Sequence, residues 1–293
     1  MAASRGRERD GGGVATLRIP SSTEFFVGAG RAFAGALLFS LPMLMTMEFW
    51  QLGFTIDPFR LALLLAIGVP LLVRLSRYGG IRHTVRLQDD VADVFVSLLI
   101  AFVTAGLLLW LFGEVAPGRP LREVWGKVAV QAFPAAIGAM LALNQFGQGD
   151  TDADADADRG EIETRYGGEL FLMVVGALFL SLNLAPTDEV AVLAFTMSVW
   201  QEIGLLVLTL LLMHAFVHAV EFGGTHRRVA GESVLGLFAR STLAGYAAVF
   251  LVSVYVLWTF GRTDGVALHE VISMAIVLSF PGAVGAAFAR LIL

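Results

Sequence analysis

Two glutamates in this chain occupy matching places in two similar apolar runs. Glu48 lies in GALLFSLPMLMTMEFWQLGFT (residues 35–55) and Glu189 in GALFLSLNLAPTDEVAVLAFT (176–196), and the two runs align without a gap. A carboxylate near hydrocarbon is costly, so a position that carries one in both runs is a candidate for a cation or proton pathway. Capping of a helix, or pairing with an arginine at the lipid–water boundary, is the structural alternative, and the sequence leaves both open.

A second pair of glutamates, Glu123 and Glu270, stands near the start of two further runs that align. These runs are LREVWGKVAVQAFPAAIGAMLA (121–142) and LHEVISMAIVLSFPGAVGAAFA (268–289). All four glutamates are expected at the outward ends of their helices, so they can line one opening on the outer side of the membrane. Glu123 and Glu270 also open their predicted helices, where the helix dipole favours an anion whatever its function. A structural role is therefore the simpler interpretation, with pairing to Arg122, Lys127 or Arg262.

Three titratable groups near residue 214 fall on one predicted helical face. His214, His218 and Glu221 are four and then three residues apart, and Glu202 lies earlier in the same apolar run. A period of 3.6 residues puts the three side chains on one side of a helix. Two histidines and a carboxylate can bind a divalent metal or conduct protons, and packing at the membrane interface is the third alternative. No cofactor follows from this pattern.

Pro134 and Pro281 stand in the middle of the two runs that carry Glu123 and Glu270, and a glycine follows each proline one turn later. Proline removes one backbone hydrogen bond from a helix, so each position is a candidate hinge, or a place where a freed carbonyl binds an ion. Close packing of neighbouring helices explains the small residues equally well.

The sequence carries no signature of a common enzyme class. It contains no phosphate-binding loop, nucleophile elbow, His-Glu-x-x-His zinc motif or dinucleotide-binding fingerprint. Because the chain also has no cysteine, it has no thiol nucleophile and no disulfide. Enzymatic activity is therefore not predicted.

The composition places the chain in a lipid bilayer. Hydrophobic residues make up 57% of it and charged residues 15%, whereas soluble proteins carry about a quarter charged residues. The apolar surface predicts contact with lipid and not with nucleic acid. The single lysine and the acidic segment GDTDADADADRGEIE resemble the composition of proteins from salt-loving archaea.

The apolar runs predict an all-α fold with eight transmembrane helices. They are expected at about residues 26–50, 58–76, 91–113, 123–146, 168–186, 198–221, 236–260 and 268–291.

The paired runs indicate that a four-helix unit has been duplicated. WLFG at 110–113 also has a counterpart, in WTFG at 258–261. A unit with an even number of spans ends on the side where it began, so the two copies should be parallel. The predicted parts are a disordered basic tail (1–24), the first repeat (25–147), an acidic linker (148–164) and the second repeat (165–293).

The distribution of basic residues predicts the orientation. Most of the 20 Lys and Arg residues fall in segments on the side of the N-terminus. By the positive-inside rule that side is the cytoplasm. We therefore expect a multi-span protein of the plasma membrane with both termini cytoplasmic.

The run GALLFSLPMLMTMEFW, the two helices that contain Phe-Pro and the duplicated layout resemble an uncharacterised prokaryotic family of integral membrane proteins of unknown function. The resemblance covers nearly all of the chain apart from the N-terminal tail and the acidic linker. It implies a multi-span helical fold, and it supplies no activity and no functional residue.

Three functions remain as hypotheses. The first is movement of a small cation or proton, with Glu48 and Glu189 as the outer site and Glu202, His214 and His218 as an inner relay. The second is a membrane sensor or scaffold that moves nothing and binds a protein or lipid partner. The third is a membrane enzyme built on the histidine face. The substrate, the coupling ion and the oligomeric state do not follow from the sequence.

Overall fold

The computed structural model describes residues 22–79, 87–147, 166–221 and 242–292, and every regular element in these ranges is a helix. The predicted tail, the linker and the segments near residues 80–86 and 222–241 lie outside the described residues. The helices are α1 Ser22–Leu44, α2 Met47–Thr55, α3 Pro58–Gly79, α4 Leu87–Leu111, α5 Leu121–Gly147, α7 Tyr166–Leu184, α8 Asp188–Thr196, α9 Val199–Glu221, α11 Ala244–Thr259 and α12 Leu268–Ile292. The predicted all-α fold is confirmed.

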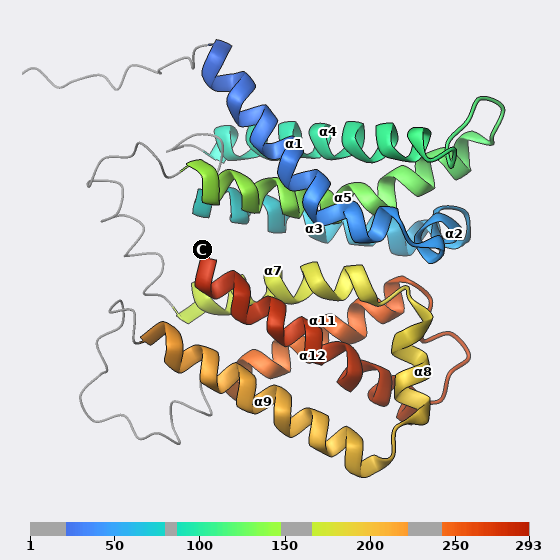
Figure 1. Cartoon of the computed structure of the whole chain (residues 1–293), viewed down its shortest axis with the longest axis vertical. Helices are drawn as coiled ribbons and strands as arrows, with labels where there is room; N and C mark the ends of the chain where they lie inside the picture. The colour runs from blue at the N-terminus through green and yellow to red at the C-terminus, as the bar shows by residue number, and fades with distance from the viewer. Residues whose placement is uncertain (1–21, 80–86, 148–165, 222–241, 293) are drawn as a thin grey trace, which may run out of the picture.

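The helices form two groups, which we call the first bundle (α1 to α5) and the second bundle (α7 to α12). Figure 1 shows the two bundles one above the other, with α1, α4, α7 and α11 all running toward the end where α2 and α8 lie. The C-terminus lies at the opposite end. In each bundle the last helix packs most extensively on the first, α5 on α1 and α12 on α7. The order and direction of the helices are therefore the same in both bundles.

Seven of the described helices are long and apolar enough to cross a membrane, and the eighth predicted span corresponds to the shorter apolar helix α11. The predicted start of that span, at 236–241, lies outside the described residues. Large apolar side chains remain exposed along the outer helices, among them Leu99 on α4 and Leu211 on α9. In a membrane protein such side chains face the acyl chains of the lipid.

The predicted bounds of the first helix were wrong. The first span was expected to be continuous over 26–50, but α1 ends at Leu44 and the separate helix α2 begins at Met47. The span expected at about 168–186 is confirmed as α7, which ends at Leu184, and the nine-residue helix α8 that follows it was not predicted.

Side-chain hydrogen bonds explain these breaks. Thr46 and Thr187 have extended backbones, and each donates its hydroxyl to the carbonyl three residues earlier, at 2.9 Å. The indole of Trp50 donates to the carbonyl of Leu44 at 2.8 Å. A backbone that leaves its helix inside a membrane needs such partners, because lipid offers none.

Two crossings of glycine on glycine hold the bundles together internally. A methyl group on Gly138 of α5 would lie 2.9 Å from the carbonyl oxygen of Gly35 on α1. A methyl group on Gly285 of α12 would collide with the carbonyl oxygen of Gly176 on α7. The helix backbones touch at both crossings, and only glycine leaves room for this.

The two bundles meet through aromatic side chains. The rings of Phe39 and Phe179 pack edge to face with their centroids 4.9 Å apart. The guanidinium of Arg74 on α3 lies 4.7 Å from the centroid of the Phe171 ring on α7. Such contacts are spread along the boundary between the bundles.

Replacing Gly285 by alanine should lower the free energy of unfolding by about 1 to 3 kcal/mol, because the added methyl group overpacks the crossing. Thermal unfolding of the purified protein in detergent measures this effect. Gly204→Ala on α9 is the matched control, since nothing lies within 4 Å of its added methyl group. The control should leave the midpoint unchanged or raise it, and an equal effect of both substitutions would contradict the close crossing.

Candidate functional site

The most deeply buried charge among the described residues belongs to Lys127 on α5, whose side chain is 2% exposed. Its Nζ lies 2.7 Å from Oε1 of Glu123 and 3.0 Å from Oε2 of Glu114. It also donates to the backbone carbonyl of Glu114 at 3.3 Å. An ammonium has three N–H donors, and all three have an acceptor here. Arg119 adds a second cation, with its Nη1 2.9 Å from Glu123 Oε1.

The crossing of α2 over α5 covers this lysine. A methyl group at Gly53 on α2 would collide with the backbone and side chain of Lys127, and one at Gly126 would collide with the carbonyl of Gly53. The Phe54 ring lies 5.8 Å from Nζ. Because the two backbones touch, water has no access to the lysine from this side.

Gln131 follows Lys127 by one helical turn and lies on the same side of α5. It is completely buried, and neither its amide nitrogen nor its amide oxygen has a hydrogen-bond partner among the described residues. Burying such an amide without partners costs roughly 2 to 7 kcal/mol. A polar group that stays buried at this cost is a candidate for binding an ion or a water molecule.

The second bundle has no counterpart of this polar stripe. In the alignment of 121–142 with 268–289, Lys127 corresponds to Met274 and Gln131 to Leu278. Both of these residues are buried, and α8 packs on α12 much as α2 packs on α5. The packing at this crossing therefore does not require a charge.

Glu48 and Glu189 lie at equivalent places, each in the first turn of its short helix. Glu48 is partly exposed and Glu189 exposed. Neither carboxylate has an ion pair or a side-chain hydrogen bond within the described part of the chain. Both stand at the N-terminus of a helix, where the dipole favours an anion.

Glu123 and Glu270 have different partners although the sequence aligns them. Glu123 is bound by Lys127 and Arg119, whereas Oε2 of Glu270 accepts a hydrogen bond of 3.1 Å from the backbone N–H of Ala267. The second contact caps the start of α12. Only Glu123 is therefore part of a buried charge network.

The predicted inner relay is distributed along α9. Glu202 lies in its first turn, and His214 is twelve residues further, which is about 18 Å along a helix. Nδ1 of His214 lies 3.0 Å from Oγ1 of Thr242. A proton cannot pass directly between groups so far apart.

The side chains of His218 and Glu221 lie outside the described residues, so the predicted metal site stays a prediction. Among the residues whose side chains are described, no three His, Asp or Glu side chains gather closely enough to hold a metal ion.

The predicted hinge prolines do not interrupt their helices. Both α5 and α12 stay helical through Pro134 and Pro281, with Pro134 buried and Pro281 partly exposed. Both candidates remain predictions, because one conformation does not test a hinge.

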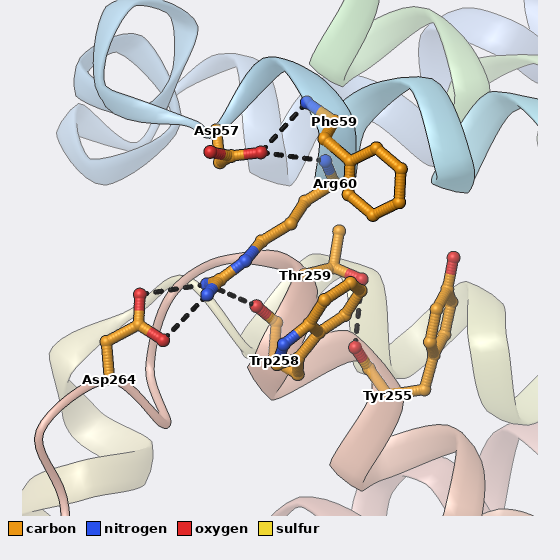
Figure 2. Close-up of polar contacts among 7 residues, drawn as sticks. All are labelled: Asp57, Phe59, Arg60, Tyr255, Trp258, Thr259 and Asp264. Carbon is orange, nitrogen blue, oxygen red and sulfur yellow. Dashed lines mark hydrogen bonds and ion pairs between the residues drawn. The ribbon is translucent and has the colours of Figure 1, made fainter.

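One charged contact joins the two bundles at the end where α2 and α8 lie. Figure 2 shows the guanidinium of Arg60, on α3, reaching the carboxylate of Asp264 between α11 and α12. The two nitrogens bind the two carboxylate oxygens at 2.8 and 2.9 Å, and Nη1 also donates to the carbonyl of Trp258 at 2.8 Å. The guanidinium lies 4.9 Å from the centroid of the Trp258 ring.

Local structure holds this arginine in place. Asp57 accepts hydrogen bonds from the backbone N–H groups of Phe59 and Arg60 at 2.8 and 3.1 Å, which caps α3. Gly261 and Gly265 have positive φ angles of 75° and 72° in the turn that carries Asp264. A planar guanidinium that binds two oxygens and stacks on an indole is a contact that lysine cannot replace.

Sequence reasoning missed the importance of several of these residues. Lys127 was considered only as a partner for a glutamate, and Gln131, Arg60 and Asp264 were not singled out. One signal for Lys127 was available: it is the only lysine in the chain, and its aligned residue is a methionine. The contact of Arg60 with Asp264 joins residues about two hundred positions apart, and no feature of the sequence indicated it.

These features define a multi-span helical membrane protein with a buried charge network near one end. The family described as "Putative integral membrane protein (DUF2391)" matches residues 28–293. The chain therefore belongs to this family, whose function is unknown. The comparisons with curated proteins and with solved structures found no match.

The pair of Arg60 and Asp264 should contribute only weakly to stability, because Asp264 is 59% exposed and solvent screens the attraction. A double-mutant cycle with Arg60→Gln and Asp264→Asn measures this coupling by thermal unfolding.

The pair of Arg262 and Asp188, at 2.7 Å, lies within the second bundle and is similarly exposed. It is the matched control for a contact that does not join the bundles. Separation of the bundles, read from spin labels on one introduced cysteine in each, should increase in Arg60→Gln and Asp264→Asn and stay unchanged in Arg262→Gln. An unchanged separation in Arg60→Gln would show that the contact does not hold the bundles together.

Proposed function

We propose that this protein moves a small cation across the membrane in a proton-linked manner, with Glu123, Lys127 and Gln131 as the proton pathway of the first bundle. The observation that carries the proposal is the fully paired ammonium of Lys127 at 2% exposure, one turn from an unpaired, completely buried amide. Ionisable groups inside a membrane are expensive, and such groups characteristically mark ion and proton paths.

The comparison between the bundles supports a functional role over a structural one. A buried ion pair seldom stabilises a protein more than well-packed apolar side chains of the same volume. The second bundle makes the corresponding crossing with Met274 and Leu278. Packing therefore does not account for the charges in the first bundle, whereas a role in proton transfer does.

A proton can pass this network without a net change in its groups. Glu123 first takes a proton from the side on which α5 begins. The Lys127 ammonium, which has then lost one of its two compensating carboxylates, passes a proton to a water molecule bound at the Gln131 amide, since the amide itself does not take up a proton. The neutral amine then takes the proton from Glu123, and both groups return to their starting states.

The other expectations from the sequence extend this proposal. Glu48 and Glu189 would concentrate cations at the mouth, since neither carboxylate has a described partner. Glu202, His214 and His218 would serve the second bundle through intervening groups, because of their separation along α9.

The arrangement of the bundles bears on the proposed duplication and orientation. The matching glycine crossings, Gly35 with Gly138 and Gly176 with Gly285, support a duplication of residues 25–147 in 165–293. Two parallel copies place both termini on one side, and the arginine-rich segments favour the cytoplasmic side of the plasma membrane.

Replacing Lys127 by methionine, the residue at the aligned position of the second bundle, should reduce transport at least tenfold without loss of folding. The assay places the purified protein in liposomes with a pH-sensitive dye inside and imposes gradients of Na⁺ or K⁺. Wild-type protein should change the internal pH, and Lys127→Met and Glu123→Gln should not.

Glu270→Gln is the matched control, because this glutamate caps a helix and holds no buried lysine. It should transport at the wild-type rate. A folded wild-type protein that produces no pH change with any gradient would favour a sensor or scaffold over a transporter. An equal loss in Glu270→Gln would contradict the special role of the first bundle.

A further inference from the structure

Three serines meet around Gly282 in the second bundle. Ser181 on α7, Ser253 on α11 and Ser279 on α12 are all completely buried. A methyl group at Gly282 would lie 3.0 Å from Oγ of Ser181 and 3.7 Å from Oγ of Ser253. The hydroxyls of Ser253 and Ser279 are 3.4 Å apart. Three helices thus bring three hydroxyls together at the face of α12 that contains Gly282.

Two of these hydroxyls present only lone pairs to the cluster. Ser253 donates its hydrogen to the carbonyl of Val249 at 3.0 Å, and Ser279 donates to the carbonyl of Ala275 at 2.5 Å. Each hydrogen is therefore occupied within its own helix. Each oxygen keeps a lone pair that can accept a hydrogen bond or bind a cation, and the buried hydroxyl of Tyr246 is a competing partner for Ser279.

The third hydroxyl completes the set of oxygens. Oγ of Ser181 is buried and has no hydrogen-bond partner among the described residues. Three neutral oxygen atoms from three helices are thus available around Gly282.

The spacing of the oxygens fits a cation better than a mutual hydrogen bond. The 3.4 Å between the Ser253 and Ser279 oxygens exceeds the roughly 2.7 to 2.8 Å of a good O–H···O bond. Two oxygens bound at a right angle to an ion at about 2.4 Å, the oxygen distance of Ca²⁺, are about 3.4 Å apart. Na⁺ has nearly the same radius as Ca²⁺. Because divalent ions take carboxylates and these ligands are neutral, the set favours the monovalent ion.

The first bundle lacks this cluster although its helices cross in the same way. The aligned residues of Ser253, Ser279 and Gly282 are alanines, and Ser181 alone is matched by a serine: Ala105, Ala132, Ala135 and Ser40. The Ser40 hydroxyl donates to the carbonyl of Ala36 at 2.5 Å. A junction that packs with methyl groups in one bundle carries hydroxyls in the other, so packing does not explain them.

We propose that Ser181, Ser253 and Ser279 bind a Na⁺ ion inside the second bundle. This site deepens the proposed function by naming the cation, and its role in transport rests on that function. Binding itself does not require transport. A Na⁺-specific stabilisation can therefore be present when the liposome assay fails, and the reverse combination is equally distinguishable.

The test is the thermal stability of the full-length protein in detergent, in NaCl, KCl and choline chloride at equal ionic strength. A ligand that binds only the folded state at about ten times its dissociation constant raises the melting temperature of a chain this size by about 3 to 6 °C. We expect this rise in NaCl alone. Ser181→Ala and Ser279→Ala should lose it, and Ser40→Ala, the matched control, should keep it.

Each other outcome decides against the site. Equal melting temperatures in NaCl and choline chloride would leave an ordered water as the better ligand for these hydroxyls. An equal rise in NaCl and KCl would reveal a general salt effect. A Na⁺-specific rise that persists in both serine variants would place the ion elsewhere. If the serine variants do not fold, a second test replaces them. Wild-type protein should broaden the ²³Na resonance of the solution, and Gly282→Ala, whose methyl group enters the cluster, must abolish this broadening.

Discussion

Close backbone contact at two helix crossings is the constraint on which the rest of this structure depends. In lipid the apolar side chains gain little by leaving the solvent, so helices associate through tight packing and buried hydrogen bonds. Gly35 with Gly138, and Gly176 with Gly285, supply that packing in the two bundles. Once α1 lies on α5 and α7 on α12, the neighbouring helices have fixed positions, and so do the polar groups that they carry.

The same packing gives the two bundles different interiors. On α5 it buries Lys127 and Gln131, near the end where α2 crosses. On α12 it buries Ser279 beside Ser181 and Ser253. Each of these polar groups stands where the other bundle has an apolar residue or an alanine, with the exception of Ser181. Two similar frameworks thus carry two different sets of buried polar atoms, and the differences are more informative about function than the similarities.

The boundary between the bundles is built differently from their interiors. Aromatic rings and the contact of Arg60 with Asp264 and Trp258 replace the glycine crossings there. Contacts of this kind are specific in geometry and modest in energy, because the charged groups are partly exposed. These contacts hold the two bundles in one arrangement. They fix the bundles to each other less firmly than the glycine crossings fix the helices within each bundle.

The sequence by itself determined the membrane class, the all-α fold and the approximate position of the spans, because apolar runs of bilayer length have few alternatives. It could not place the breaks before α2 and α8, since these depend on hydroxyl and indole hydrogen bonds to backbone carbonyls.

Tertiary structure alone decided that Lys127, four residues after Glu123 in the sequence, is buried against that glutamate. Glu123 and Glu270 look alike in sequence, and they differ because Gly53 and Gly126 let α2 cover Lys127, whereas a methionine occupies the matching place in the second bundle. Burial and pairing are properties of helices that meet in space, and local sequence carries no direct record of them.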